Sequence, residues 1–174
     1  MAVVSIGPFG GRGGREWSCM FSGGLKRIIV SYESCIHSLV FQDSSGTFSQ
    51  KFGSDNGFIG GCQVKEVLID WPNEYLVSLS GRLGSHGRAR CTVKYLVFQT
   101  NARSYSFGVE HRGDTSFSIP IKSGVIVGFH GRSGLLVDSI GLHVAPINPV
   151  PQVQAPQIQE SKIFAPFRPK RSSP

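Results

Sequence analysis

The sequence predicts an all-β protein. Short runs rich in β-branched and aromatic residues recur through the first 146 residues, and turns rich in glycine, serine and aspartate separate them. No long segment follows the 3.6-residue period of an amphipathic helix. The composition agrees, with 22 glycines, 10 prolines and only 17% charged residues. We therefore expect many short strands joined by tight turns, the pattern of a sandwich, barrel or prism.

About a dozen strands are expected, and turn chemistry marks most of their boundaries. A glycine-dense loop at 7–15 follows the first strand, and the turn at 43–46, Asp-Ser-Ser-Gly, reverses the chain. Residues 81–87 contain three glycines and are expected to form a flexible loop. The predicted strands, in order, are residues 3–6, 17–21, 28–32, 36–42, 47–52, 63–69, 75–80, 90–100, 104–107, 116–120, 125–129 and 135–144.

One strand pattern occurs twice. The segment IHSLVFQ at 36–42 parallels VKYLVFQ at 93–99, and each is followed by a polar turn and then by Phe-Gly, at 52–53 and at 107–108. A repeated hairpin of this kind predicts internal pseudosymmetry.

The pattern changes after Pro146. We divide the chain into a domain at 1–146 and a proline-rich basic tail at 147–174, which is expected to be extended and disordered. The net charge is +7; the tail holds four basic residues and one acidic residue, which assigns +3 to the tail and +4 to the domain. The segment at 164–171 is either a solvated stretch or a short docking or nuclear-import motif.

Composition also argues against several sites and locations. The four cysteines, at 19, 35, 62 and 91, lie too far apart for zinc-ligand spacing, so neither a metal site nor a cofactor is expected. The N-terminus has no charged start and no apolar run of signal length, and no stretch is long enough to span a membrane. We expect reduced thiols and a location in the cytosol or nucleus.

The segment at 126–141 concentrates binding chemistry. It predicts two strands joined by a loop from Gly131 to Asp138, with Gly131 and Gly134 turning the chain at positive φ. The backbone N–H groups of Leu135 and Leu136 have no ladder to join, and Asp138 supplies a carboxylate that only accepts hydrogen bonds. A carboxylate beside unpaired N–H groups suits a ligand with adjacent hydroxyls, which is a sugar.

Two distant motifs carry a family resemblance. The run GFHGRSG at 128–134, followed by DSIG at 138–141, is similar to the C-terminal signature of the jacalin-related lectins. The run GPFGGRGG at 7–14 resembles the opening loop of the same family. The resemblance covers about residues 3–146. It implies a β-prism of three four-stranded sheets with pseudo-threefold symmetry around one apolar core, in a single-domain, mannose-binding plant protein of a kind often tied to defence or stress responses.

The resemblance also implies a site. By position, Gly14, Leu135 and Leu136 would offer backbone N–H groups to a sugar, and Asp138 would accept from two neighbouring hydroxyls. Gly134 and Asp138 meet the family's Gly-x-x-x-Asp pattern, although the polar residue that often follows the glycine is Leu135 here. The uncut opening loop resembles the mannose/glucose-preferring, cytoplasmic branch. Residues 31–36 lack a second such loop, so one sugar site per chain is expected.

Weak monovalent affinity, about 0.1–10 mM, is expected for such a site. Useful avidity would then come from a homo-oligomer, a dimer or higher, binding mannose- or glucose-containing glycans.

Two other functions stay open at this point. Residues 10–15 look like a short Arg-Gly element, which together with the basic tail would bind RNA. Alternatively, the domain is a protein-interaction module without sugar affinity, in which Leu135 and Leu136 form part of an apolar patch. No enzyme is expected, because Ser133 lacks a Gly-x-Ser-x-Gly context and the histidines are scattered.

Overall fold

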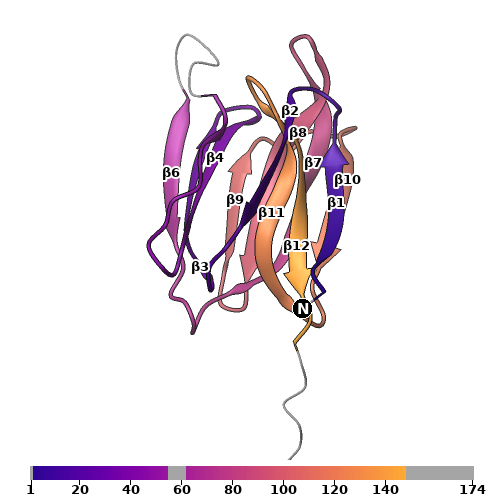
Figure 1. The fold of residues 1–174 in the computed structure, drawn as a ribbon. Helices are drawn as coiled ribbons and strands as arrows, with labels where there is room; N and C mark the ends of the chain where they lie inside the picture. Colours follow the sequence, from indigo (N-terminus) through magenta and orange to yellow (C-terminus); the bar gives the residue numbers. More distant parts are fainter. Residues whose placement is uncertain (1, 55–61, 148–174) are drawn as a thin grey trace, which may run out of the picture.

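The computed structural model describes residues 2–54 and 62–147, and this part of the chain is all-β, without a helix (Figure 1). Its strands form three four-stranded antiparallel sheets. The predicted β-prism is confirmed. Sheet I has the order β1-β12-β11-β2, sheet II β5-β4-β3-β6 and sheet III β10-β7-β8-β9. The strands are β1 (Val4–Gly10), β2 (Arg15–Met20), β3 (Leu25–Tyr32), β4 (Ile36–Asp43), β5 (Phe52–Gly53), β6 (Gln63–Leu68), β7 (Leu76–His86), β8 (Ala89–Thr100), β9 (Ser104–Gly108), β10 (Thr115–Pro120), β11 (Val125–Ser133) and β12 (Val137–Ala145).

One core lies between the three sheets, and each sheet contributes a fully buried phenylalanine to it. Phe129 of sheet I stacks on Phe41 of sheet II, with ring centroids 4.5 Å apart and planes 9° apart. Phe98 of sheet III meets Phe129 edge-on at 6.0 Å. Both arrangements are favourable for aromatic quadrupoles and bury large apolar areas. The three rings therefore tie the sheets to one another.

The internal repeat is real and occurs once in every sheet. Leu39 of β4 pairs with Phe52, and Leu96 of β8 pairs with Phe107, each partner belonging to a Phe-Gly pair in an edge strand. The third copy, which the sequence did not reveal, is Ile140 of β12 opposite Phe9 of β1. Two residues before each of these central positions lie His37, Lys94 and Asp138, so only one of the three equivalent positions carries a carboxylate.

Some predicted elements were wrong. The glycine-dense loop predicted at 7–15 is limited to residues 11–14, because β1 continues to Gly10 and β2 begins at Arg15. Residues 81–87 do not form a flexible loop, because β7 continues to His86. Gly81 and Gly84 provide space for their neighbours: a Cβ at Gly81 would lie 2.2 Å from the Tyr95 carbonyl oxygen, and one at Gly84 would lie 2.2 Å from Asp114 Oδ1. The strand predicted at 47–52 is mostly irregular, with one bridge between Gln42 and Phe48 before the short strand β5.

The tail predicted at 147–174, with its motif at 164–171, lies outside the described residues apart from the exposed Ile147. In the described ranges, no helix has the length and apolar character to cross a membrane. The four cysteines are free, and Cys35 is fully buried, where loss of solvation raises the pKa of its thiol to about 11.

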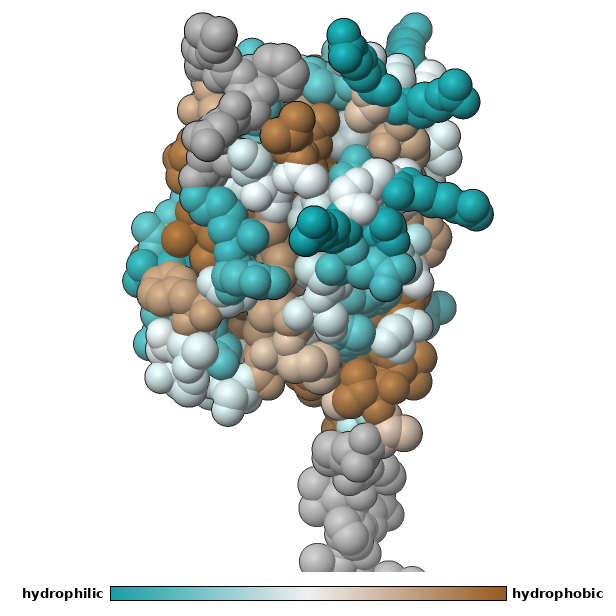
Figure 2. Space-filling model, turned by 45° about the horizontal axis from the view of Figure 1, so that its top comes forward, coloured by the Kyte–Doolittle hydropathy of each residue, from teal (hydrophilic) through white to brown (hydrophobic). Residues whose placement is uncertain are grey.

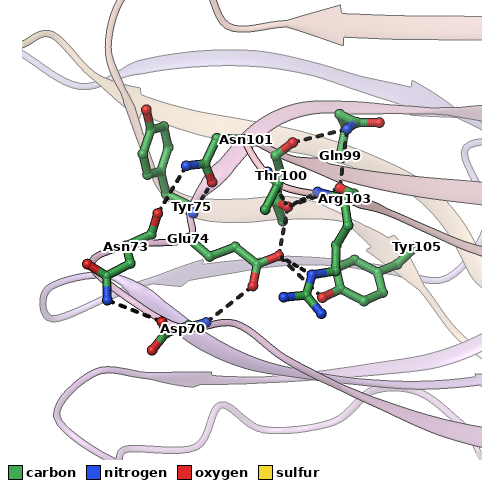
Figure 3. Close-up of polar contacts among 10 residues, drawn as sticks. Asp70, Asn73, Glu74, Tyr75, Gln99, Thr100, Asn101, Arg103 and Tyr105 are labelled. Atoms are coloured by element: carbon green, nitrogen blue, oxygen red, sulfur yellow. Dashed lines mark hydrogen bonds and ion pairs between the residues drawn. The ribbon is translucent and has the colours of Figure 1, made fainter.

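A buried carboxylate fastens the end of the prism where β7 and β9 begin. Glu74, 3% exposed, accepts hydrogen bonds from Thr100 Oγ1 at 2.7 Å and Tyr105 OH at 3.3 Å, and pairs with Arg103 Nε at 3.2 Å (Figure 3). The backbone N–H of Asp70 donates to its other oxygen at 3.4 Å. Burial acts to raise the pKa of Glu74, but the hydrogen bonds and the Arg103 charge outweigh it and lower the pKa below its ordinary 4.5. This network stabilises the connection between sheets II and III.

Candidate sugar-binding site

Three chain segments meet at the other end of the prism and enclose a cavity of about 480 Å³. They are the opening loop at 11–14, the bend at 134–136 between β11 and β12, and the turn between β7 and β8. All of the residues that the sequence placed in a sugar site line this cavity, together with residues of the β7–β8 turn: Gly14, His86, Gly87, Arg88, Ala89, Gly134, Leu135, Leu136 and Asp138.

The opening loop needs its glycines because it packs directly on the β11–β12 hairpin. Gly14 has φ of 59°, and a Cβ there would lie 2.2 Å from the Ser133 carbonyl carbon. A Cβ on Gly13 would lie 2.6 Å from Asp138 Oδ1. The Gly11 N–H also donates to the Asp138 carbonyl oxygen at 2.8 Å. The loop thus forms one wall of the cavity and brings the Gly14 backbone beside Asp138.

The bend at 134–136 differs in detail from the sequence prediction. The loop is shorter than 131–138, because Gly131 lies within β11, and neither Gly131 nor Gly134 has a positive φ. Gly131 is required for space instead, since a Cβ would lie 2.0 Å from the Ser139 carbonyl oxygen. Leu135 is 70% exposed, whereas the side chain of Leu136 is buried, so only Leu135 could contribute to the apolar patch considered as an alternative.

The backbone donors of the site are unpaired, as predicted. The Gly134 N–H bonds to the Leu136 carbonyl oxygen at 3.0 Å across the bend. Within the part of the chain that the structure describes, the N–H groups of Gly14, Leu135 and Leu136 make no hydrogen bond to protein. A backbone N–H group without a protein partner can donate to water or to a ligand, so these three are available to a ligand.

Asp138 is the carboxylate that lines this cavity. Asp138 is only 7% exposed. Among residues 2–54 and 62–147, its carboxylate accepts no hydrogen bond. Burial raises the pKa of Asp138, and the positive charge of Arg132 acts in the opposite direction. Because Asp138 lines the cavity, its carboxylate can accept hydrogen bonds from hydroxyl groups that enter there.

Arg132 is a positioning residue that the sequence did not identify. Its Nε and Nη2 donate to the carbonyl oxygens of Gly13 at 3.1 Å and Gly14 at 2.9 Å, and Nη1 pairs with Glu16 Oε1 at 2.8 Å. One guanidinium therefore holds the opening loop against the β11–β12 hairpin. Its partners lie more than a hundred residues away in the sequence, so no local spacing could have indicated the contact.

Replacing Arg132 with methionine is expected to weaken sugar binding about tenfold, because the loop loses two charge-assisted hydrogen bonds that fix Gly14. Calorimetric titration with methyl α-mannoside measures the effect. The matched control is Arg82→Met, which removes another exposed arginine–glutamate pair, with Glu110, outside the cavity. Equal affinity in the two variants would contradict the role assigned to Arg132.

A second cavity, of about 440 Å³, lies over the outer face of sheet I. There the rings of His130 and His143 stack at 4.7 Å, and His143 bonds to Ser5 and Ser18. The carboxylate that lines this second cavity, Glu16, is already paired with Arg132. The second cavity therefore lacks the unpaired acceptor that the first cavity has. Among the described residues no group of three or more histidines, cysteines or carboxylates could hold a metal ion.

The family model described as "Jacalin-like lectin domain" matches residues 6–143. The chain belongs to the jacalin-like lectin domain family. Jacalin-related lectin 19 of Arabidopsis thaliana is 34% identical over 146 residues, which cover 82% of this chain and 81% of that protein. The mannose/glucose-specific lectin of Parkia pendula is 40% identical over 83% of this chain, but the chain spans only 32% of that longer relative.

Solved structures of the family agree with the fold of this jacalin-like domain. A mannose-specific jacalin-related lectin from Morus nigra, in complex with mannose, superimposes with a TM-score of 0.72 at 33% identity, covering 83% of this chain and 96% of that one. An artocarpin–mannotriose complex gives a TM-score of 0.73 at 30% identity, covering 83% and 99%.

Proposed function

We propose that this jacalin-like domain is a lectin that binds mannose- or glucose-type glycans in the cavity between the opening loop and the bend at 134–136. The observation that carries the proposal is Asp138, a buried carboxylate that lines a cavity and has no hydrogen-bond donor among the described residues. The unpaired N–H groups of Gly14, Leu135 and Leu136 lie around the same cavity.

This arrangement complements a pyranose ring. Two adjacent hydroxyls can donate to the two oxygens of Asp138, and the same hydroxyls or the ring oxygen can accept from the backbone N–H groups. Each hydrogen bond to the charged acceptor contributes roughly 1.5–3 kcal/mol before the sugar's own desolvation is subtracted. The net monovalent affinity is therefore expected to lie near 0.1–10 mM.

The relatives support the sugar class. The two Parkia proteins are named as mannose/glucose-specific lectins, and the complexed Morus nigra structure is named as mannose-specific.

Calorimetric titration with methyl α-mannoside and methyl α-galactoside tests the proposal. We expect millimolar binding of the mannoside and weaker binding of the galactoside, whose axial 4-hydroxyl reaches Asp138 less well. If the folded protein binds neither sugar at tens of millimolar, the proposal is wrong.

Binding is also expected to weaken on acidification. Because burial raises the pKa of Asp138, the carboxylate takes up a proton at a pH above its ordinary pKa of 3.8. Protonation removes one acceptor position and the negative charge, so the affinity should be constant near neutral pH and fall before pH 3.8 is reached. Affinity for methyl α-mannoside measured from pH 7 downward checks this. An affinity that stays constant down to pH 3.8, in protein that remains folded, would contradict it.

The alternatives have less support. The Arg-Gly segment at 10–15 is packed into the prism through Gly11, Gly13 and Gly14, which differs from the mobile segments that bind RNA by charge and stacking. Leu136 cannot contribute to an apolar docking patch, because its side chain is buried. The positions equivalent to Asp138 in the other two sheets are His37 and Lys94, which supports one sugar site of this kind per chain.

The remaining parts of the proposal concern the setting of the domain. The named relatives are lectins, which supports binding without catalysis. A homo-oligomer would convert weak sites into useful avidity. The free cysteines are consistent with a reducing compartment such as the cytosol or nucleus. The Arabidopsis and Parkia relatives support a plant source. A role in defence or stress is also part of the proposal.

A further inference from the structure

The arginines of the described residues divide into two groups. Four of them pair with glutamates: Arg27 with Glu66, Arg82 with Glu110, Arg103 with Glu74 and Arg132 with Glu16. The others, all exposed, form no ion pair within residues 2–54 and 62–147: Arg12, Arg15, Arg88, Arg90 and Arg112.

The unpaired arginines lie at one end of the prism. Arg12 lies in the β1–β2 loop, Arg88 in the β7–β8 turn and Arg112 in the β9–β10 loop, while Arg15 begins β2 and Arg90 lies near the start of β8. Figure 2 brings this end forward, and hydrophilic side chains project from it. The loops are in contact, since a Cβ at Gly11 would lie 2.2 Å from the Cys91 carbonyl oxygen while Gly13 packs on Asp138. Arg12 therefore lies between the β7–β8 and β11–β12 hairpins, and Arg90 directly precedes Cys91.

Arg88 lines the sugar cavity itself. It belongs to the β7–β8 turn, whereas Asp138 belongs to the β11–β12 hairpin. A guanidinium offers planar, paired donors that match a carboxylate or sulfate. Neighbouring unpaired arginines raise the local concentration of anions, and salt screens this effect.

We propose that the site prefers acidic glycans, in which a neutral hexose occupies the Asp138 side of the cavity and an adjoining sugar presents an anionic group to Arg88. The preference rests on the proposed sugar site. The anionic group belongs on the adjoining sugar because a second anion next to the Asp138 carboxylate would be repelled. Arg88 is thus a specificity-determining residue. The positive charges of Arg12 and Arg90 add to the electrostatic attraction of the anionic group.

A matched pair of ligands tests the preference. Glucuronosyl-mannose and its carboxyl-reduced twin, glucosyl-mannose, differ only in one carboxylate, and both the (1→2)- and (1→3)-linked forms are titrated at low and high salt. The variants are Arg88→Gln and Arg112→Gln. Both remove one positive charge from the same end of the domain, but only Arg88 lines the cavity.

We expect at least one acidic disaccharide to bind about five- to tenfold more tightly than its neutral twin at low salt, and the difference to shrink at high salt. Arg88→Gln should abolish the difference between the two twins, whereas Arg112→Gln should preserve most of it. Equal binding of the two twins by the wild type, or equal losses in both variants, would overturn the preference but leave the sugar site standing. Failure of all ligands to bind would remove the proposed function together with the preference.

Discussion

Asp138→Asn is expected to reduce the affinity for methyl α-mannoside about 100-fold, which makes a millimolar interaction undetectable by calorimetry. The side chains are nearly the same size, so the cavity keeps its shape. Asparagine has one acceptor oxygen and no charge, and the two hydrogen bonds that it weakens or loses are each worth roughly 1.5–3 kcal/mol. The measurement is a titration of wild type and variant under identical conditions.

The stability of the same variant separates a binding role from a folding role. The pKa of Asp138 is raised in the folded protein, so its ionised form opposes folding at neutral pH. Asp138→Asn should therefore unfold at the same or higher denaturant concentration at pH 7 than the wild type. A variant that binds mannoside normally would contradict the assignment of Asp138, and a strongly destabilised variant would show that the carboxylate has a structural partner instead.

Glu74→Ala is expected to lower the free energy of unfolding by roughly 3 kcal/mol, because Thr100 loses its buried acceptor and a cavity remains. In a domain of this size that corresponds to about 6–12 °C in Tm. Glu66→Ala is the matched control, since Glu66 also pairs with an arginine but has a side chain that is 45% exposed. Its expected cost is below about 1 kcal/mol.

The pH dependence of stability gives a second readout for Glu74. Its pKa is lowered in the folded protein, so its contribution is complete above the ordinary pKa of 4.5 and is lost as the pH falls through the folded value. The wild type should lose more stability than Glu74→Ala over that acidic range. Equal unfolding free energies for the Glu74 and Glu66 variants would show that the network contributes little.

The sequence was most informative where the physics is local. Short runs of β-branched and aromatic residues between turns predicted nearly every strand, and the repeated segments at 36–42 and 93–99 revealed a symmetry that Phe52 and Phe107 then confirmed. Asp138 and the N–H groups of Leu135 and Leu136 could be predicted as a site because a loop between two strands leaves its backbone donors unpaired, while Gly14 and Gly134 were predicted from the family resemblance.

The errors arose where distant segments decide the outcome. Glycines at 81 and 84 suggested flexibility, but their purpose is to make room for Tyr95 and Asp114. Leu136 looked exposed in a polar loop, whereas the fold buries it beside an exposed Leu135. Arg132 gave no signal at all, because its partners in the opening loop come together with it only when β2 pairs with β11.

Nuclear magnetic resonance mapping with methyl α-mannoside tests the location of the site most directly. If the account is right, the amide resonances of Gly14, Leu135 and Leu136 shift together as the sugar is added, with one dissociation constant, while those of His130 and His143 on the outer face of sheet I stay in place. Shifts confined to the outer face, with Gly14 and Leu136 unaffected, would mean that the sugar binds elsewhere and that the cavity beside Asp138 is not the lectin site.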